Sequence, residues 1–320
     1  MFGKLKRILK KNGFFGGIKY IISKLTGRAA LVESVDTLYY FLEKCVDIKT
    51  FPKATGSLRD LQECDVALLK VFDLACRKNN LTYWMDWGTL LGAVRHGGFI
   101  PWDDDMDVSM PREDYDRALE ILPKEFAEFG IDVGEFSFKP LASFGFSIKH
   151  RQTGIWLDVF PVDEYYCKDE QDIAVLKKKI GKYQKFYKKK KLKKSKQQLL
   201  DKKNALLADF LTKTDERCNA ILCHNIEFLD PKLNVHYASD VFPLGAVEFD
   251  GCSFAAPKNP DAFLRAEYGN NYMSFPKSGA EHHGDDAGKL KNWAAANNIN
   301  MKDVLAELEG IADAYEGRNA

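Results

Sequence analysis

Residues 83–110 read YWMDWGTLLGAVRHGGFIPWDDDMDVSM, a stretch that combines a glycine turn, a basic pair and a run of aspartates. Apolar runs flank these polar side chains. Packing alone does not explain polar groups at this density, because a buried polar group costs free energy unless it is paired. We interpret the stretch as the floor and one wall of an active site that handles phosphate groups.

Two carboxylates of this stretch are spaced to act together. Asp105 and Asp107 are two residues apart, and in a strand, predicted here at residues 106–110, that spacing places both side chains on one face. A third carboxylate, Asp158, lies in the apolar segment IWLDVF at residues 155–160, where a lone charge is costly unless it is paired or binds a metal. We expect Asp158 to face the pair, and three such carboxylates suit one or two Mg²⁺ or Mn²⁺ ions.

Groups that suit a phosphate precede the aspartates. Gly88 and Thr89 are predicted to form a turn before a short helix, and they offer backbone N–H groups and a hydroxyl. Arg95, His96 and Lys149 could each neutralise a diphosphate, and the alternative for each is an ion pair with a nearby aspartate.

The periodicity predicts an α+β fold in which helices flank a mixed β-sheet. A helix is predicted at residues 57–79, with Ser57 as N-cap and an apolar stripe of Leu61, Leu68, Phe72, Ala75 and Cys76. Further helices are predicted at residues 90–95, at 112–122, with Pro123 as the stop, at 260–268, with Asn259 as the cap, at 287–296 and at 301–315. Strands are predicted at residues 81–87, 106–110, 131–133, 136–138, 144–149 and 155–160, with a hairpin around Asp250-Gly251.

Composition narrows the class of protein. The seven cysteines are scattered and form no CxxC pair, which argues against a disulfide framework and a thiolate zinc site and favours a reducing cytoplasm. No apolar run approaches the ~20 residues of a membrane span. We therefore expect a globular protein.

The net charge of +1 conceals a strong segregation of charge. Residues 1–28 hold eight Lys or Arg and no acid at amphipathic spacing, which favours a helix on an anionic membrane surface over one docked on the protein itself. A lysine-rich helical insertion is predicted at about residues 168–212, with apolar stripes of Leu176, Ile180, Tyr183 and Tyr187 and then of Leu199, Leu206 and Phe210. No nucleic-acid motif accompanies these lysines, so a nucleic-acid partner is not expected.

The amino-acid sequence of the central stretch resembles that of a known family. GTLLGAVRHGGFIPWDDDMDVSMPREDY at residues 88–115 is similar to the signature of the LicD family, which includes the fukutin-type proteins. The similarity continues in GIWLDVFPVD at residues 154–163 and more loosely through residues 242–276. The basic N-terminus and the lysine-rich stretch lie outside the shared pattern. We therefore expect a catalytic domain over residues 57–320 that carries the lysine-rich stretch as an insertion.

The resemblance implies a nucleotidyltransferase-like fold and a transfer reaction. A phospho-alcohol, either phosphocholine or a polyol phosphate, would pass from a CDP-activated donor to a hydroxyl of a cell-surface glycan or its lipid-linked precursor. Asp105, Asp107 and Asp158 would be the catalytic residues and metal ligands. Gly88, Thr89, Arg95, His96, Lys149, Arg112 and His283 would bind substrate, with His282 as the alternative to His283 and with Asp104 or Asp116 as alternative partners of Arg112.

The sequence allows alternative roles for several residues and for the protein as a whole. Asp103 and Asp104 match the family run and are expected to brace the loop. Trp84, Trp87 and Trp102 could stack on a base or hold a quaternary ammonium, or belong to the core. Rival functions are a nucleotidyltransferase that releases pyrophosphate and a non-catalytic membrane-bound scaffold for glycan assembly. The expected location is the cytoplasm, peripherally at the inner face of the cell membrane.

Overall fold

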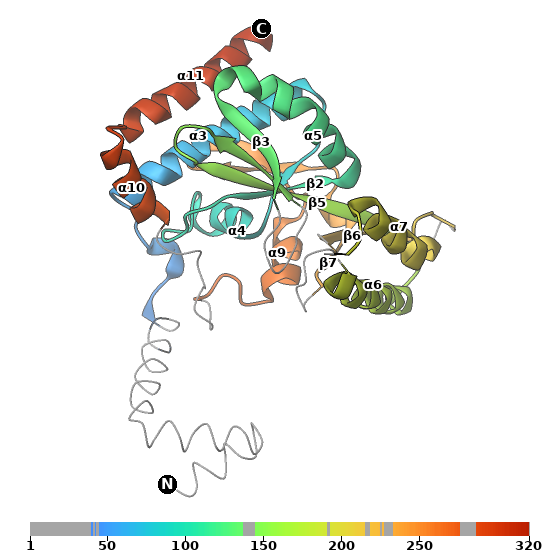
Figure 1. The fold of residues 1–320 in the computed structure, drawn as a ribbon. Helices are drawn as coiled ribbons and strands as arrows, with labels where there is room; N and C mark the ends of the chain where they lie inside the picture. Colours follow the sequence, from blue (N-terminus) through green and yellow to red (C-terminus); the bar gives the residue numbers. More distant parts are fainter. Residues whose placement is uncertain are drawn as a thin grey trace, which may run out of the picture. The chain divides into compact units, whose positions relative to one another are not determined.

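The computed structural model describes residues 40, 42, 45–136, 145–190, 193–214, 218–224, 226, 233–275 and 286–319 (Figure 1). The chain divides into two compact units. The smaller comprises residues 1–51 and 273–280, and its described part holds the 3-10 helix η1 (Ile48–Thr50) and a ring contact between Phe51 and Phe275. The larger comprises residues 52–272 and 281–320 and contains the sheet. The predicted basic helix at residues 1–28 and both His282 and His283 lie outside the described residues.

Within the described residues, seven strands form one mixed sheet in the order β1-β2-β5-β4-β3, and β6 pairs with both β5 and β7. Only β2 and β5 pair in parallel among them. This mixed sheet confirms the predicted α+β class. The strands are β1 (Trp84–Met85), β2 (Asp107–Pro111), β3 (Ile131–Phe136), β4 (Gly145–His150), β5 (Trp156–Cys167), β6 (Asn219–His224) and β7 (Val235–Tyr237).

Helices pack against this sheet because each carries an apolar stripe. In α3 (Ser57–Lys78) the predicted stripe is buried and contacts β5 and α11 (Met301–Asn319). Helix α5 (Arg112–Phe126) contacts β2, β3 and β5, while α10 (Asp286–Ala296) packs on α3.

Several predicted boundaries were wrong. The strand predicted at residues 155–160 continues to Cys167 as β5, and the strands predicted at 131–133 and 136–138 are joined in β3 through Phe136. Gly56, rather than Ser57, is the N-cap of α3. Helix α5 continues through Pro123 to Phe126, since Leu122 and Phe126 are fully buried and their packing outweighs the one lost backbone hydrogen bond. The strand predicted at residues 81–87 is shortened to β1 because a helix already begins at Trp87.

The lysine-rich stretch forms α6 (Glu170–Lys190) and α7 (Lys196–Leu207). The predicted stripes lie in or against one apolar cluster with Tyr165 of β5 and Ile221 of β6. Figure 1 shows both helices beside β6 and β7, at the opposite end of the sheet from α10. Strands β6 and β7 follow this stretch and were not predicted, since short runs such as NAILCH lack clear flanking turn signals.

The predicted hairpin consists of β8 (Gly245–Phe249) and β9 (Cys252–Ala256), and its turn reaches the loop after α4 (Trp87–His96). Asp250 donates its N–H to the Gly97 carbonyl and accepts hydrogen bonds from Lys53 and Arg59. Short helix α8 (Ala238–Val241) precedes the hairpin, and α9 (Pro260–Tyr268) follows it with the predicted cap, Asn259. No helix in the described part of the chain combines the length and the hydropathy of a membrane span.

Candidate active site

The centre of the site is a pair of aspartates on the two parallel strands. Asp107 of β2 and Asp158 of β5 occupy the same register position, directly before the buried pair Val108 and Val159. Because side chains at matched positions of neighbouring strands lie on the same face, the two carboxylates are neighbours. Both are partly exposed, and Asp105 lies two residues before Asp107, just outside the strand. The structure thus brings the three predicted carboxylates together.

Burial and like charge act on these carboxylates in the same direction. Burial, followed by the charges of Asp105 and Asp158, raises the pKa of Asp107 well above its usual value. Burial also raises the pKa of Asp158 to about 7, with a further increase from Asp105, while hydrogen bonds from Ser147 and Trp156 oppose the shift. Burial and the neighbouring carboxylates therefore disfavour the ionised forms of Asp107 and Asp158.

Two further aspartates, Asp103 and Asp104, lie close to Asp105. Asp103 and Asp104 are buried, and each offers an oxygen within 4.8 Å of one from Asp105 and from each other. Helix α3 contacts this segment, because the side-chain amide of Gln62 donates to the backbone carbonyl of Asp103 at 2.9 Å. Asp65, one turn further along, has its pKa raised by burial and then by Asp105, Asp104 and Asp103.

Helix α4 begins at this cluster. The predicted glycine turn is instead the first helical turn, because Asp86 caps the helix by accepting the Trp87 N–H at 2.7 Å. A Cβ on Gly88 would lie 2.8 Å from Asp103 Oδ2, so glycine permits the close approach of that carboxylate. Thr89 is buried, and its hydroxyl accepts the Asp107 N–H at 2.8 Å. The first turn of α4 thus positions Asp103 and Asp107.

Trp87 adopts a positive φ of 39°, a conformation that is rare for a bulky side chain. Its ring is partly exposed and packs edge-to-face on Phe160 at 4.4 Å between centroids. Backbone strain of this kind concentrates at functional sites. Of the other tryptophans weighed from the sequence, Trp84 is fully buried in the core and Trp102 is partly exposed beside His96.

The basic residues that follow the first turn of α4 form hydrogen bonds within the protein. Arg95 is buried, donates to the Tyr272 carbonyl at 3.0 Å, and bonds His96 at 2.9 Å. Burial lowers the pKa of Arg95 to about 10, while the charges of Tyr268 and Asp103 raise it. Burial and the charge of Arg95 lower the pKa of His96 to about 4, so its ring is neutral.

Lys149 and Arg112 act on different aspartates of β5. Lys149 on β4 is exposed, and its charge lowers the pKa of Asp158. Arg112, at the start of α5, forms a bidentate pair with Asp163 through two 2.9 Å hydrogen bonds. A buried lysine of α7, Lys203, bonds the same carboxylate at 2.9 Å. Asp163 is thus a partner of Arg112 that sequence reasoning did not name.

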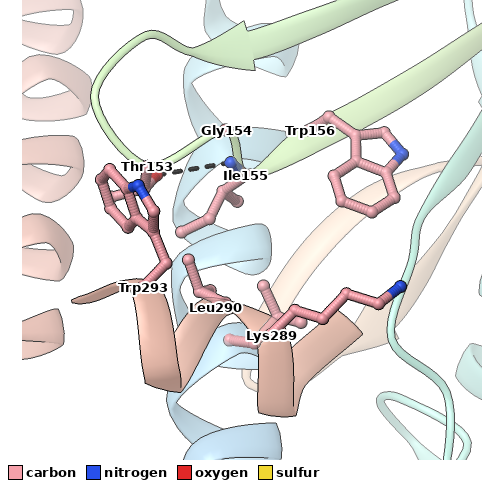
Figure 2. A pocket seen from close by; sticks show the side chains of 8 residues that line it. Thr153, Gly154, Ile155, Trp156, Lys289, Leu290 and Trp293 are labelled. Carbon is pink, nitrogen blue, oxygen red and sulfur yellow. Dashed lines mark hydrogen bonds between the residues drawn. The ribbon is translucent and has the colours of Figure 1, made fainter. Parts of the chain in front are cut away.

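A cavity of about 220 Å³ lies beside the N-terminal end of β5 (Figure 2). Trp156, two residues before Asp158, and Trp293 of α10 line it together with Lys289, whose side chain extends toward the side of Trp156. Its remaining lining residues are Leu61, Thr153, Gly154, Ile155 and Leu290.

Sequence reasoning missed three residues near the acidic cluster. Asp65 falls on the apolar stripe of α3, and a carboxylate at such a position was the available signal. Asp86 is completely buried and bonds both the Trp87 N–H and the Ser109 hydroxyl. Tyr268, the last residue of α9, is 44% exposed, yet burial of its hydroxyl, followed by the charges of Glu267, Asp86, Asp107 and Asp103, raises its pKa.

The mixed sheet thus pairs two aspartates on adjacent parallel strands, close to the N-terminus of α4. Residues 80–193 match the family model LicD/FKTN/FKRP, nucleotidyltransferase domain. The match ends within the lysine-rich stretch and includes α6, so the family pattern extends further into that stretch than predicted.

Individual relatives align over shorter segments. Lipopolysaccharide cholinephosphotransferase LicD of Haemophilus influenzae is 42% identical over 72 residues, which are 22% of this chain and 27% of that protein. An uncharacterized protein of Rickettsia prowazekii is 52% identical over 56 residues, 18% of this chain and 21% of that protein. Human ribitol 5-phosphate transferase FKRP is 37% identical over 81 residues, 25% of this chain and 15% of that protein. The chain therefore aligns with well under a third of the length of each relative.

Proposed function

We propose that this protein transfers a phospho-alcohol, phosphocholine or a polyol phosphate, from a CDP-activated donor to a hydroxyl of a glycan or its lipid-linked precursor. The observation that carries the proposal is the in-register pair Asp107 and Asp158, with Asp105 beside it, inside a segment that matches the LicD/FKTN/FKRP family. The names of two relatives, a cholinephosphotransferase and a ribitol 5-phosphate transferase, support the substrate class.

We assign a divalent cation, Mg²⁺ or Mn²⁺, to Asp105, Asp107 and Asp158. Their donor set fits, because carboxylate oxygens are the ligands that these hard ions prefer. The raised pKa values of Asp107 and Asp158 fit as well, since they come first from burial and then from neighbouring carboxylates, and a cation would neutralise that like charge. When bound, such an ion neutralises charge on the diphosphate of the donor.

In the proposed reaction, the acceptor hydroxyl oxygen attacks the phosphorus that carries the alcohol. The bond from that phosphorus to the oxygen bridging it to CMP breaks, and CMP leaves with the bond electrons. The proton of the hydroxyl passes to one of the three carboxylates, which acts as general base. Lys149 lies exposed near Asp158 and contributes positive charge for the diphosphate. Thr89 holds Asp107 of β2 through its backbone N–H, and Asp86 holds Ser109 of β2 and the start of α4.

The cavity beside Trp156 and Trp293 is our candidate for the acceptor. Aromatic faces suit the apolar faces of sugar rings, and Asp158 follows Trp156 by two residues. We further propose that residues 1–28 attach the protein to an anionic membrane surface at the inner face of the cell membrane, because they carry eight basic residues and no acid. Flotation with liposomes should then require both anionic lipid and residues 1–28.

The decisive test incubates the purified chain with Mg²⁺, lipid-linked acceptors and CDP-choline, CDP-ribitol or CDP-glycerol, and measures CMP. Acceptor-dependent release of CMP with one donor is expected, and Asp105→Asn should abolish it. The exposed Asp313→Asn on α11 is the matched control and should react as the wild type does. Release of pyrophosphate from a nucleoside triphosphate would favour a nucleotidyltransferase instead. A chain that neither binds nor turns over any activated donor would support the scaffold alternative.

A further inference from the structure

A second group of potential metal ligands lies outside the three catalytic carboxylates. His224 at the end of β6, His236 in β7 and Glu267 in α9 each offer one ligand atom, and these atoms all lie within 4.8 Å of one another. The side chains of the three residues are 8%, 2% and 4% exposed. Three separate elements therefore converge on one buried point.

The distances within this group suit a small cation. His224 Nδ1 lies 3.5 Å from Glu267 Oε1, and His236 Nε2 lies 2.7 Å from the same oxygen. Donors around a tetrahedral zinc ion lie about 3.3 Å apart, given metal–nitrogen bonds of about 2.0 Å. The 3.5 Å separation from His224 to Glu267 already matches this value. The 2.7 Å separation from His236 to Glu267 needs to open by less than about 1 Å.

His224 supplies an independent observation that points to a ligand at this position. Neither of its ring nitrogens makes a hydrogen bond to any residue in the described part of the chain, although its side chain is more than nine-tenths buried. Buried imidazole nitrogens normally have a partner, so an unsatisfied ring aimed at a carboxylate and a second histidine requires an explanation. A hydrogen-bonded core cluster would account for His236 and Glu267 but leaves His224 unsatisfied.

The surroundings hold the ligand atoms in place. Asn234 donates to Glu267 Oε2 at 2.5 Å, which leaves Oε1 directed at the two histidines. His236 stacks on Phe263 at 3.9 Å between centroids, with an interplanar angle of 11°. On the far side of His224, Nε2 faces Asp86 Oδ2 at 3.4 Å, the relation of a carboxylate that orients a metal-bound histidine. Burial lowers the pKa of His236 to about 4, and the neutral ring is the form that binds metal.

We propose that His224 Nδ1, His236 Nε2 and Glu267 Oε1 bind a transition-metal ion, Zn²⁺ foremost, at a site separate from the catalytic carboxylates. Two imidazoles and one carboxylate are borderline ligands that suit zinc, whereas the aspartate cluster is all oxygen and suits Mg²⁺. The ion joins β6, β7 and α9, and through Asp86 it supports the N-cap of α4. Its role is structural: it fixes α9, and with it Tyr268, against the sheet.

The test uses the full chain, stripped with a chelator and titrated with Zn²⁺ alone, with metal content measured by mass spectrometry. About one equivalent of zinc should remain after desalting, and the melting temperature should rise because a ligand of the folded state stabilises it. Co²⁺ in its place should give the visible absorption of a tetrahedral nitrogen and oxygen site. Glu267→Gln and His236→Ala should weaken binding at least about 100-fold, and Asp86→Asn by about 10- to 100-fold.

Two controls keep the test decisive. Asp105→Asn removes a carboxylate of the other cluster and should retain zinc, and His150→Gln replaces a buried histidine that bonds Thr153 and should also retain it. Circular dichroism of Glu267→Gln, a change that preserves shape, separates loss of metal from loss of fold. The proposal is overturned if the wild type binds zinc no more tightly than folded Glu267→Gln, or if Asp105→Asn loses the zinc that Glu267→Gln keeps.

Discussion

Asp107 and Asp158 lie side by side because β2 and β5 pair in parallel with these two residues at the same register position. The next pair, Val108 and Val159, is fully buried, so a slip by one residue would expose the valines and bury the carboxylates. The same apolar pattern that fixes the sheet therefore forces two like charges together. Proteins retain such an arrangement for function, since it disfavours the folded state unless a cation is bound.

Asp107→Asn should abolish transfer while preserving the fold. We expect kcat to fall by at least about 100-fold, because the variant loses one charged ligand of the proposed cation. Without Mg²⁺ the variant should melt at or above the wild-type temperature, since a carboxylate that is buried and repelled by Asp105 and Asp158 has been removed. CMP release and thermal unfolding, each with and without Mg²⁺, measure both effects. Retained activity in the folded variant would contradict the assignment.

The stability of the metal-free protein should fall as the pH rises from about 4 to about 7. Burial and then Asp105 raise the pKa of Asp158 to about 7, compared with about 3.9 in an unfolded chain. A carboxyl with a raised folded-state pKa stabilises the fold below its unfolded pKa, and this contribution is lost as the pH rises through the folded value. Melting temperatures in EDTA across this range provide the measurement.

Asp158→Asn should flatten this pH profile, and saturating Mg²⁺ should flatten it in the wild type by neutralising the carboxylates. An unchanged slope in Asp158→Asn would assign the effect to other groups.

Gly88→Ala should lower activity more than it lowers stability. The new Cβ would lie 2.8 Å from Asp103 Oδ2, so the carboxylate must move away from the start of α4. We expect a loss of about 10-fold or more in kcat/KM, because displacements of about 1 Å near reacting groups are costly. Gly310→Ala in α11 is the control: it meets nothing within 4 Å and should stabilise the helix by about 0.5–1 kcal/mol. Wild-type kinetics in Gly88→Ala would show that the position of Asp103 is not critical.

Lys203→Met should destabilise the protein, whereas the neighbouring Lys202→Met should not. Lys203 is 3% exposed and bonds Asp163, while Lys202 is exposed. We expect Lys203→Met to lower the free energy of unfolding by about 2–3 kcal/mol. This is less than the cost of a fully broken buried pair, because Arg112 still neutralises Asp163. Lys202→Met should change stability by less than about 0.5 kcal/mol. Urea unfolding measures both, and equal values would contradict a buried role for Lys203.

Local pattern was sufficient for most elements of this fold. The apolar stripes of α3 and α6, the Asp250-Gly251 hairpin and the Asn259 cap depend on neighbours in sequence, and each was predicted correctly. Prediction was wrong where packing outweighs local preference. Pro123 remains inside α5 because Leu122 and Phe126 are buried on either side of it. Helix α4 begins before Gly88 because Asp86 caps it from a fully buried position.

The sequence by itself determined which carboxylates are candidates and which family the central segment resembles, because residue type and spacing along one strand are local properties. Only the tertiary structure decided their partners. Asp107 meets Asp158 through strand register, Arg112 and Lys203 meet at Asp163, and His224, His236 and Glu267 converge from three elements. These contacts join residues far apart in the chain, and their geometry follows from how the core packs rather than from any local motif.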